Sequence, residues 1–177
     1  HYSRKAPVGK LVKFGIWEDG SFVGSVIYSC GSAGVGSMGK SFGLKNTEVV
    51  ELARVALTKH RTSVSKIVSV TMRLLKREQS GIRMAVSYAD PLQQHVGTIY
   101  QAMNWVYVGR SSKDTAYIDA SGKRWHSRSV SESGWKVHMG IRTRCPKPST
   151  MKSVDVEPKY KYLYPLDEAM KRKIELL

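Results

Sequence analysis

The sequence predicts a mixed α/β (α+β) fold, and three segments support this. Residues 11–17 and 22–28 are apolar and are joined by a short polar connection, which predicts an antiparallel hairpin. Residues 64–77 place their apolar side chains on one face of a helix. Residues 82–88 alternate as a buried strand does.

Length and composition indicate one domain with an anionic partner. The 177 residues are enough to bury a core. The 29 Lys and Arg residues against 14 Asp and Glu give a formal net charge of +15, which favours a nucleic acid above a membrane surface. No apolar run approaches a membrane span, and Cys30 and Cys145 fit a reducing cytoplasm. Because the chain starts at His1 without an initiator methionine, we expect residues before it to be absent.

The first half of the chain joins strands through polar segments. Residues 1–4 are polar, and a frayed terminus is one interpretation of them. Residues 30–46 contain several glycines without the spacing of a phosphate loop, so we expect a mobile surface loop whose Lys40 and Lys45 contact phosphates. Residues 48–57 are rich in β-branched side chains and predict a strand, after which Thr62 or Ser63 can cap the helix.

The stretch 82–107 carries the candidate chemistry. Open α/β sheets bind ligands at the carboxyl ends of strands, and this strand ends with Ser87, Tyr88 and Asp90. Pro91 biases the residue before it away from helix, so the chain turns there. A helix over residues 96–104 then brings Tyr100 back to the same end. We therefore expect a hydroxyl, a carboxylate and a phenol to converge in one crevice.

The second half of the chain predicts more strands and a basic surface. Residues 105–110, 135–141 and 159–164 predict strands, residues 142–157 predict a surface loop, and residues 166–177 predict a helix. Residues 111–133 interleave basic and aromatic side chains, which suits nucleic acid because charge binds phosphate and rings stack on bases. The residues expected to bind DNA there are Lys123, Arg124, Trp125 and Arg128. A solvated hairpin is the alternative interpretation.

Four separated blocks resemble the Mom family of phage DNA-modification enzymes, a branch of the GNAT acyltransferase superfamily. The blocks are HYSRKAP at residues 1–7, ELARVAL at 51–57, SYAD at 87–90 and HVGTIYQAMNW at 95–105. The resemblance implies a single GNAT-like domain with a mixed, mostly antiparallel central sheet flanked by helices. It also implies that adenine in double-stranded DNA is converted to N6-carbamoylmethyladenine, which shields phage DNA from restriction in the host cytoplasm.

The resemblance implies that Tyr100 protonates the leaving group, as a tyrosine of the superfamily does. The side chains themselves suggest two further roles. Asp90 would orient or deprotonate the acceptor amine, because a carboxylate pairs well with an exocyclic amino group, and Ser87 would hydrogen-bond donor or acceptor. His1 and Tyr2 would face the active site. The loop before the helix would hold the donor on backbone amides and basic side chains, through Lys59, His60, Arg61, Thr62, Ser63 and Ser65. This loop contains none of the glycines that the superfamily uses, and a basic helix cap on the surface is the alternative.

The sequence leaves two hypotheses for the identity of the group donor. The superfamily implies an acyl-coenzyme A, but acetyl-coenzyme A lacks the nitrogen of the product. Because carbamoylmethyl and glycyl groups are isomers, glycyl-tRNA is a second hypothesis. The sequence predicts no metal site, since His1, His60 and Asp90 have no ligand spacing. Two other functions compete: an N-acetyltransferase for a protein or small amine, and a non-catalytic DNA-binding protein on a transferase fold.

Overall fold

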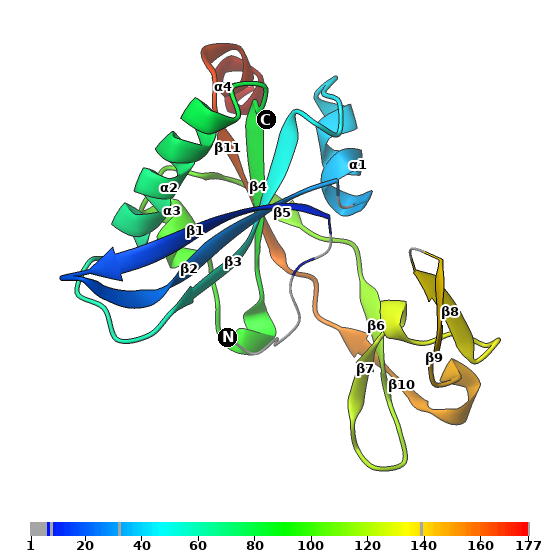
Figure 1. Cartoon of the computed structure of the whole chain (residues 1–177). Helices are drawn as coiled ribbons and strands as arrows, with labels where there is room; N and C mark the ends of the chain where they lie inside the picture. Colours follow the sequence, from blue (N-terminus) through cyan, green and yellow to red (C-terminus); the bar gives the residue numbers. More distant parts are fainter. Residues whose placement is uncertain (1–6, 8, 32, 139, 177) are drawn as a thin grey trace. The chain divides into compact units, whose positions relative to one another are not determined.

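The structure is a computed structural model that describes residues 7, 9–31, 33–138 and 140–176 (Figure 1). It contains two compact units. Unit 1 comprises residues 1–109 and 160–177, and unit 2 comprises residues 110–159. The expectation of a single domain stays a prediction.

Unit 1 is built on a six-stranded sheet with the order β1-β2-β3-β4-β11-β5. The strands are β1 (Lys10–Glu18), β2 (Ser21–Cys30), β3 (Val49–Leu57), β4 (Met84–Ala89), β5 (Val106–Arg110) and β11 (Tyr160–Pro165). The pairs β1–β2, β2–β3 and β4–β11 are antiparallel, whereas β3 and β4 run parallel. The predicted mixed α+β class, with its mostly antiparallel sheet, is therefore confirmed.

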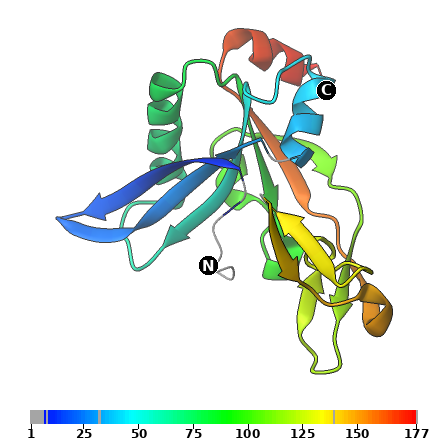
Figure 2. The same cartoon turned by 45° about the vertical axis from the view of Figure 1, so that its right-hand side comes forward.

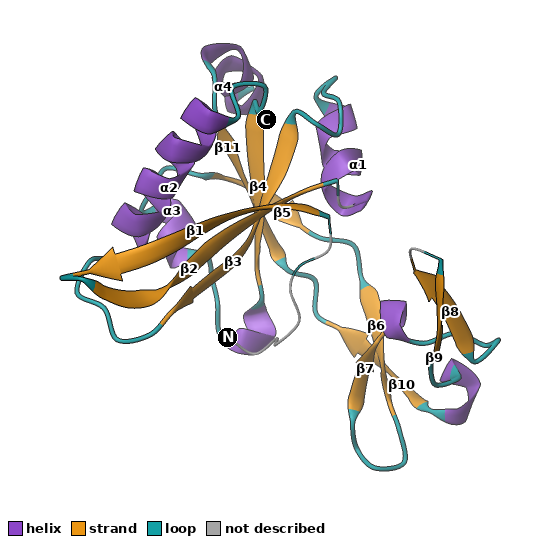
Figure 3. Cartoon of the chain, in the orientation of Figure 1, coloured by secondary structure: helices purple, strands orange, loops and turns teal. Residues whose placement is uncertain are grey.

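Helices cover both faces of this sheet (Figure 3). The helices α2 (Val64–Glu78) and α3 (Thr98–Gln101) pack in the larger buried cluster with Tyr28 of β2. The helices α1 (Ala33–Ser41) and α4 (Glu168–Glu175) pack on the other face against Val86 of β4. The predicted amphipathic helix is thus confirmed as α2, and the helix expected over residues 96–104 is shorter than predicted.

The sheet divides where β3 and β4 separate. Their parallel ladder runs from Val49 opposite Met84 to Glu51 opposite Val86. Beyond these residues β3 continues to pair with β2, and β4 continues to pair with β11. We call this point the fork. It places the carboxyl-terminal parts of two strands on either side of an opening in the ladder, next to the sheet edge where open sheets bind ligands.

The prediction of a mobile loop over residues 30–46 was wrong, because part of that segment is the helix α1. Glycine disfavours a helix by about 1 kcal/mol per residue, so the sequence argued against it. Close packing explains the outcome. A Cβ at Gly36 would lie 2.6 Å from Asn46 Oδ1, and one at Gly39 would lie 2.6 Å from Val49 Cγ2. Glycine lets the helix approach the sheet closely enough to bury Val35.

Unit 2 consists of two small antiparallel sheets (Figure 2). The first has the order β10-β6-β7, and the second pairs β8 with β9. The elements are β6 (Asp114–Ile118), β7 (Arg124–His126), η2 (Ser127–Ser129), β8 (Trp135–His138), β9 (Ile141–Arg144), η3 (Pro148–Thr150) and β10 (Lys152–Val156). The strand expected over 135–141 begins at Trp135 as predicted but ends at His138, and the prediction of a loop over 142–157 was wrong. The chain reverses at Gly140, whose φ of +78° suits glycine, and both segments contain strands.

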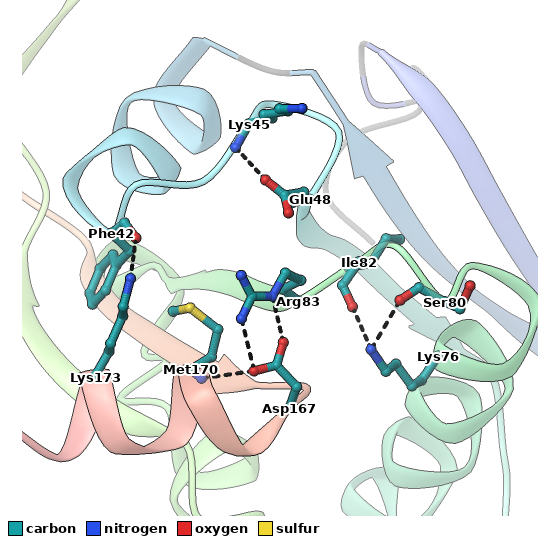
Figure 4. Close-up of polar contacts among 10 residues, drawn as sticks. All are labelled: Phe42, Lys45, Glu48, Lys76, Ser80, Ile82, Arg83, Asp167, Met170 and Lys173. Atoms are coloured by element: carbon teal, nitrogen blue, oxygen red, sulfur yellow. Dashed lines mark hydrogen bonds and ion pairs between the residues drawn. The ribbon is translucent and has the colours of Figure 1, made fainter.

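The start of α4 is held by Asp167 (Figure 4). One carboxylate oxygen accepts a hydrogen bond from the Met170 backbone N–H at 2.8 Å, which caps the helix. Arg83, just before β4, donates to both oxygens at 2.7 and 3.2 Å. The hydrogen bonds from Arg83 hold the pKa of the Asp167 carboxyl below its ordinary value.

We expect Asp167→Ala to lower the free energy of unfolding by about 1–2 kcal/mol near neutral pH, since it removes a cap and a partly buried ion pair. The carboxyl pKa is lower in the folded chain than in the unfolded chain. The stabilisation is therefore present above the unfolded value of about 3.9 and is lost as the pH falls through the folded value. Urea denaturation at pH 7 and below pH 3 measures this. Asp167→Asn keeps a capping oxygen, so it should lose less. If Asp167→Ala is destabilised by the same amount below pH 3 as at pH 7, the ionised Asp167 carboxylate is not the stabilising group.

Candidate functional site

A pair of buried hydroxyl groups lies at the fork. Ser87 of β4 is fully buried, and Tyr100 of α3 is 8% exposed. Ser87 Oγ lies 2.8 Å from Tyr100 Oη and donates to the Leu52 carbonyl oxygen at 2.9 Å. Leu52 and Ser87 are the first residues of β3 and β4 beyond their shared ladder. The serine hydroxyl therefore connects the two strands where the backbone ladder has ended.

Serine carries a single hydroxyl proton, and a carbonyl oxygen only accepts. Ser87 Oγ donates toward both the Leu52 carbonyl oxygen and Tyr100 Oη, so these two acceptors share its proton. The serine hydroxyl therefore connects the phenol to the β3 backbone. The prediction that Ser87 and Tyr100 meet holds in the structure, although they meet inside the buried cluster.

An aromatic groove lies next to this pair. It has a volume of about 410 Å³ and is lined by Val96, Gln101, Trp105, Tyr107, Tyr160 and Tyr162. The Tyr100 ring centroid lies 5.1 Å from that of Trp105 and 5.0 Å from that of Tyr162. Tyr162 stands opposite Ser87 in the β4–β11 ladder. The buried hydroxyl pair is therefore separated from the groove by two aromatic rings.

Hydrogen bonds fix one side of the aromatic groove. Tyr162 Oη donates to the Val96 carbonyl oxygen at 2.8 Å and accepts from Gln101 Nε2 at 3.2 Å. Gln101 Nε2 also donates to Val96 at 3.3 Å. Trp105 is 5% exposed, and its buried Nε1–H donates to no atom of the described residues. A buried donor without a partner is rare in native proteins and calls for an explanation.

The carboxylate of Asp90 has a local structural contact. Its Oδ1 accepts from the Leu92 backbone N–H at 3.1 Å, so Asp90 caps the short helix η1 (Pro91–Gln93). Tyr88 packs against the cluster on the opposite face from Ser87, because successive side chains of a strand alternate. Tyr88 therefore does not share the crevice expected for it. The structure brings Ser87 and Tyr100 together, and the expected meeting of Asp90 with them stays a prediction.

The predicted donor loop, residues 58–63, already holds a carboxylate. Glu18, at the end of β1, accepts from the backbone N–H of Arg61 at 2.8 Å and from that of Thr62 at 2.9 Å. Arg61 also forms an ion pair with Asp19 in the β1–β2 turn. The amides expected to bind a donor phosphate are thus engaged by an anion of the chain itself. A second groove of about 280 Å³ adjoins this contact, with Thr62 and Lys66 on one side and Trp17 on the other.

The other predicted donor residues make local contacts. His60 Nδ1 lies 2.7 Å from the Thr58 carbonyl oxygen, and Ser65 Oγ donates to Ser63 Oγ at 3.4 Å. Ser63 is the N-cap of α2, but its side chain makes no capping hydrogen bond. Lys59 is exposed. Their role toward a donor stays a prediction.

Glu18 is expected to titrate at an unusually low pH. Hydrogen bonds from the Arg61 backbone and from the Thr62 side chain and backbone lower the pKa of the Glu18 carboxyl to about 2. Thr62→Val removes one of these donors, so the pKa should rise toward that of a free glutamate. The carboxyl carbon shift followed by NMR against pH measures this. Thr58→Val is the matched control, because the Thr58 hydroxyl donates to Val23 instead. An unchanged pKa in Thr62→Val would disprove the hydroxyl contact.

The predicted DNA-binding residues divide between the units. Lys40 and Lys45 of unit 1 are exposed, as are Lys123, Arg124 and Arg128 of unit 2. Trp125 is half-buried, and its Nε1 donates to Asp119 Oδ2 at 2.7 Å, while Lys123 Nζ lies 4.0 Å from its ring centroid. The contacts of Trp125 therefore order the β6–β7 turn, and DNA binding by these residues stays a prediction.

The remaining sequence-based expectations concern the first residues and a metal. His1 and Tyr2 lie outside the described residues. Within residues 7, 9–31, 33–138 and 140–176, no group of three His, Cys, Asp or Glu side chains is arranged to hold a metal ion. The described part of the chain has no helix both long and apolar enough to cross a membrane.

Sequence reasoning missed the aromatic groove and Glu18. The period of two in KYKYLY places Tyr160, Tyr162 and Tyr164 on one face of a strand, and the same period relates Trp105 to Tyr107. This signal was available, but the sequence did not reveal that β5 and β11 are neighbours. Glu18 carried no signal, because its partners lie more than forty residues away in the chain.

Fold and site together define an α+β protein with an aromatic groove beside a buried hydroxyl pair. The sequence model of the Mom protein family matches residues 1–177. The chain therefore belongs to the Mom protein family. Membership of this family makes it a phage DNA-modification enzyme. No curated protein matches it.

Proposed function

We propose that this protein converts adenine in double-stranded DNA to N6-carbamoylmethyladenine and so protects phage DNA from restriction in the host cytoplasm. The observation that carries the proposal is the family match over the whole chain. The net charge of +15 suits a polyanionic substrate, because basic side chains neutralise phosphates. The exposed Lys40, Lys45, Lys123, Arg124 and Arg128 are the proposed phosphate contacts.

The proposed reaction is a group transfer of the GNAT type. The N6 amine attacks the carbonyl carbon of the donor, the new C–N bond forms, and the bond to the leaving group breaks. Tyr100 supplies the proton to the leaving group, and Ser87 holds the phenol by hydrogen bonding. Asp90 accepts a hydrogen bond from the amine and receives its proton. The described geometry supports the Tyr100–Ser87 part of this scheme.

The donor has to supply a nitrogen atom. If a glycyl ester such as glycyl-tRNA is the donor, transfer gives N6-glycyladenine, which has the same atoms as the product. The glycyl amine then attacks ring carbon C6, and the bond between C6 and the amide nitrogen breaks to leave the carbamoylmethyl group. An acyl-coenzyme A is the alternative donor. Residues 59–63 and Ser65 are the proposed donor contacts, and a donor phosphate would have to displace Glu18 from the amides of Arg61 and Thr62.

Mass spectrometry of nucleosides from cells that make the protein tests the function. We expect N6-carbamoylmethyladenine in their DNA and none in cells that carry an empty vector. Purified protein with DNA and each donor in turn then identifies the donor. DNA without modified adenine, in cells that contain the folded protein, would overturn the proposal.

A further inference from the structure

We propose that the aromatic groove binds the adenine ring after the base has left the DNA duplex. This inference rests on the proposed function, because it assigns the position of the base that is modified. An enzyme that acts on a base inside duplex DNA must extrude it into a pocket. All six residues that line the groove belong to unit 1, on α3, β5, β11 and the segments beside them (Figure 1).

The rings of the groove can stack on a flat base. The Tyr107 ring centroid lies 6.2 Å from that of Tyr160 and 5.6 Å from that of Tyr162. Tyr107 is 50% exposed, and Val96 beside it is 54% exposed. Large apolar side chains that remain exposed around a concave surface mark ligand sites. Because every base has a π face, such rings bind bases by stacking.

The polar atoms of the groove match adenine. Gln101 Nε2 is engaged with Tyr162 and Val96, and these two hydrogen bonds fix the orientation of the carboxamide. Gln101 Oε1 receives no hydrogen bond within the described part of the chain, so it can accept from an exocyclic amine. Trp105 also lines the groove, and its buried Nε1–H has no partner among the described residues, so a base that opens the groove toward this atom can satisfy it through a ring nitrogen. Adenine offers both an amine donor and ring nitrogen acceptors.

The fixed carboxamide also disfavours guanine. Guanine presents the acceptor O6 where adenine presents its amine. To donate to O6, Gln101 would have to rotate its amide and break its hydrogen bonds to Tyr162 and Val96. The groove therefore binds adenine in preference to guanine.

The groove lies close to the residues of the proposed chemistry. Trp105 and Tyr162 line the groove on one side and contact the Tyr100 ring on the other. One layer of rings therefore separates a base in the groove from Tyr100, and these rings have to move before the phenol comes within hydrogen-bond reach of the leaving group. Tyr160, opposite Ala89, brings the groove to the end of β4 where Asp90 follows.

Binding of two matched DNA duplexes tests the inference. One duplex carries a mismatched adenine, which is cheap to extrude, and the other carries an abasic site at that position. We expect tighter binding of the adenine duplex and a shift of the Trp105 indole N–H resonance with that duplex alone. Trp105→Phe assigns the resonance. Equal affinities for the two duplexes, or shifts confined to other indoles, would overturn the inference.

Variants of the groove separate stacking from general binding. Tyr107→Ala should reduce the preference for the adenine duplex by about 5- to 150-fold and leave binding of the abasic duplex unchanged. Phe22→Ala is the control, because Phe22 is also an exposed aromatic residue of unit 1 but lies outside the groove. Gln101→Leu should reduce the preference for mismatched adenine over mismatched guanine.

The two proposals fail in different ways. If cellular DNA contains the modified adenine at wild-type levels in Tyr107→Ala, the function stands and the groove assignment falls. If no modification occurs but the adenine duplex still shifts Trp105 and needs Tyr107, the groove stands as a base-binding site and the proposed reaction falls.

Discussion

Replacing Tyr100 with Phe is expected to lower the rate of adenine modification by about 100- to 10,000-fold, which is the usual contribution of a general acid. The ring is retained, so its contacts with Trp105 and Tyr162 survive and the groove keeps its shape. Ser87 keeps its hydrogen bond to Leu52. The phenol proton is the main loss. Quantitative nucleoside mass spectrometry in a time course with purified protein, donor and DNA measures the rate.

Tyr28→Phe is the matched control for this variant. Tyr28 is also a buried tyrosine, and its hydroxyl lies 2.8 Å from the Thr71 hydroxyl, which in turn donates to the Val68 carbonyl oxygen. Both variants thus remove a phenol and leave a hydroxyl bonded to the backbone, so each should lower the free energy of unfolding by about 1 kcal/mol. Both variants should bind DNA as the wild type does, but only Tyr100→Phe should lose turnover. Equal rates for Tyr100→Phe and the wild type would remove the tyrosine from the mechanism.

Gly97→Ala is expected to lower the free energy of unfolding by roughly 2–5 kcal/mol. Gly97 precedes α3 with a φ of +84°, and this conformation costs an L-residue about 1–2 kcal/mol. A Cβ there would also lie 2.4 Å from the ring of Tyr162, and overpacking typically adds about 1–3 kcal/mol. Urea denaturation measures the difference, provided that the free energy of unfolding falls with urea concentration at the same slope in the variant and the wild type.

Gly43→Ala isolates the contribution of the backbone. Gly43 also has a positive φ, of +72°, but no atom of the described residues lies within 4 Å of its ideal Cβ position. We expect this variant to lose only the conformational part, about 1–2 kcal/mol. The excess in Gly97→Ala reports the contact with Tyr162. If the two variants lose equal free energies of unfolding, the Tyr162 ring moves aside without destabilising the fold.

The local patterns of unit 1 predicted most of its fold. The hairpin of β1 and β2 followed from two apolar runs around a short turn, and α2 followed from its apolar face, because both signals lie within a few residues of each other in the chain. The helix α1 escaped this reasoning. Its glycines lower helix propensity, and the contacts that compensate come from Asn46 and Val49 outside the helix.

The site was predictable only in part, for the same reason. The strand ending at Ser87 and the helix carrying Tyr100 are close in sequence, and their meeting could be inferred. The aromatic groove needs β5 beside β11, two strands separated by the whole of unit 2 in the chain. In unit 2, short strands with mostly exposed residues gave weak periodicity, so the β8–β9 hairpin was misassigned.

The contact of Glu18 with the α2 loop sets a threshold for anion binding at that loop. The carboxylate is an intramolecular competitor that the fold holds against the Arg61 and Thr62 amides. A solitary phosphate has to displace it and gains only the same two hydrogen bonds. A ligand that also fills the neighbouring groove beside Trp17 and Lys66 gains further contacts and can prevail. An anionic ligand of this loop would therefore be selected by its size as well as by its charge.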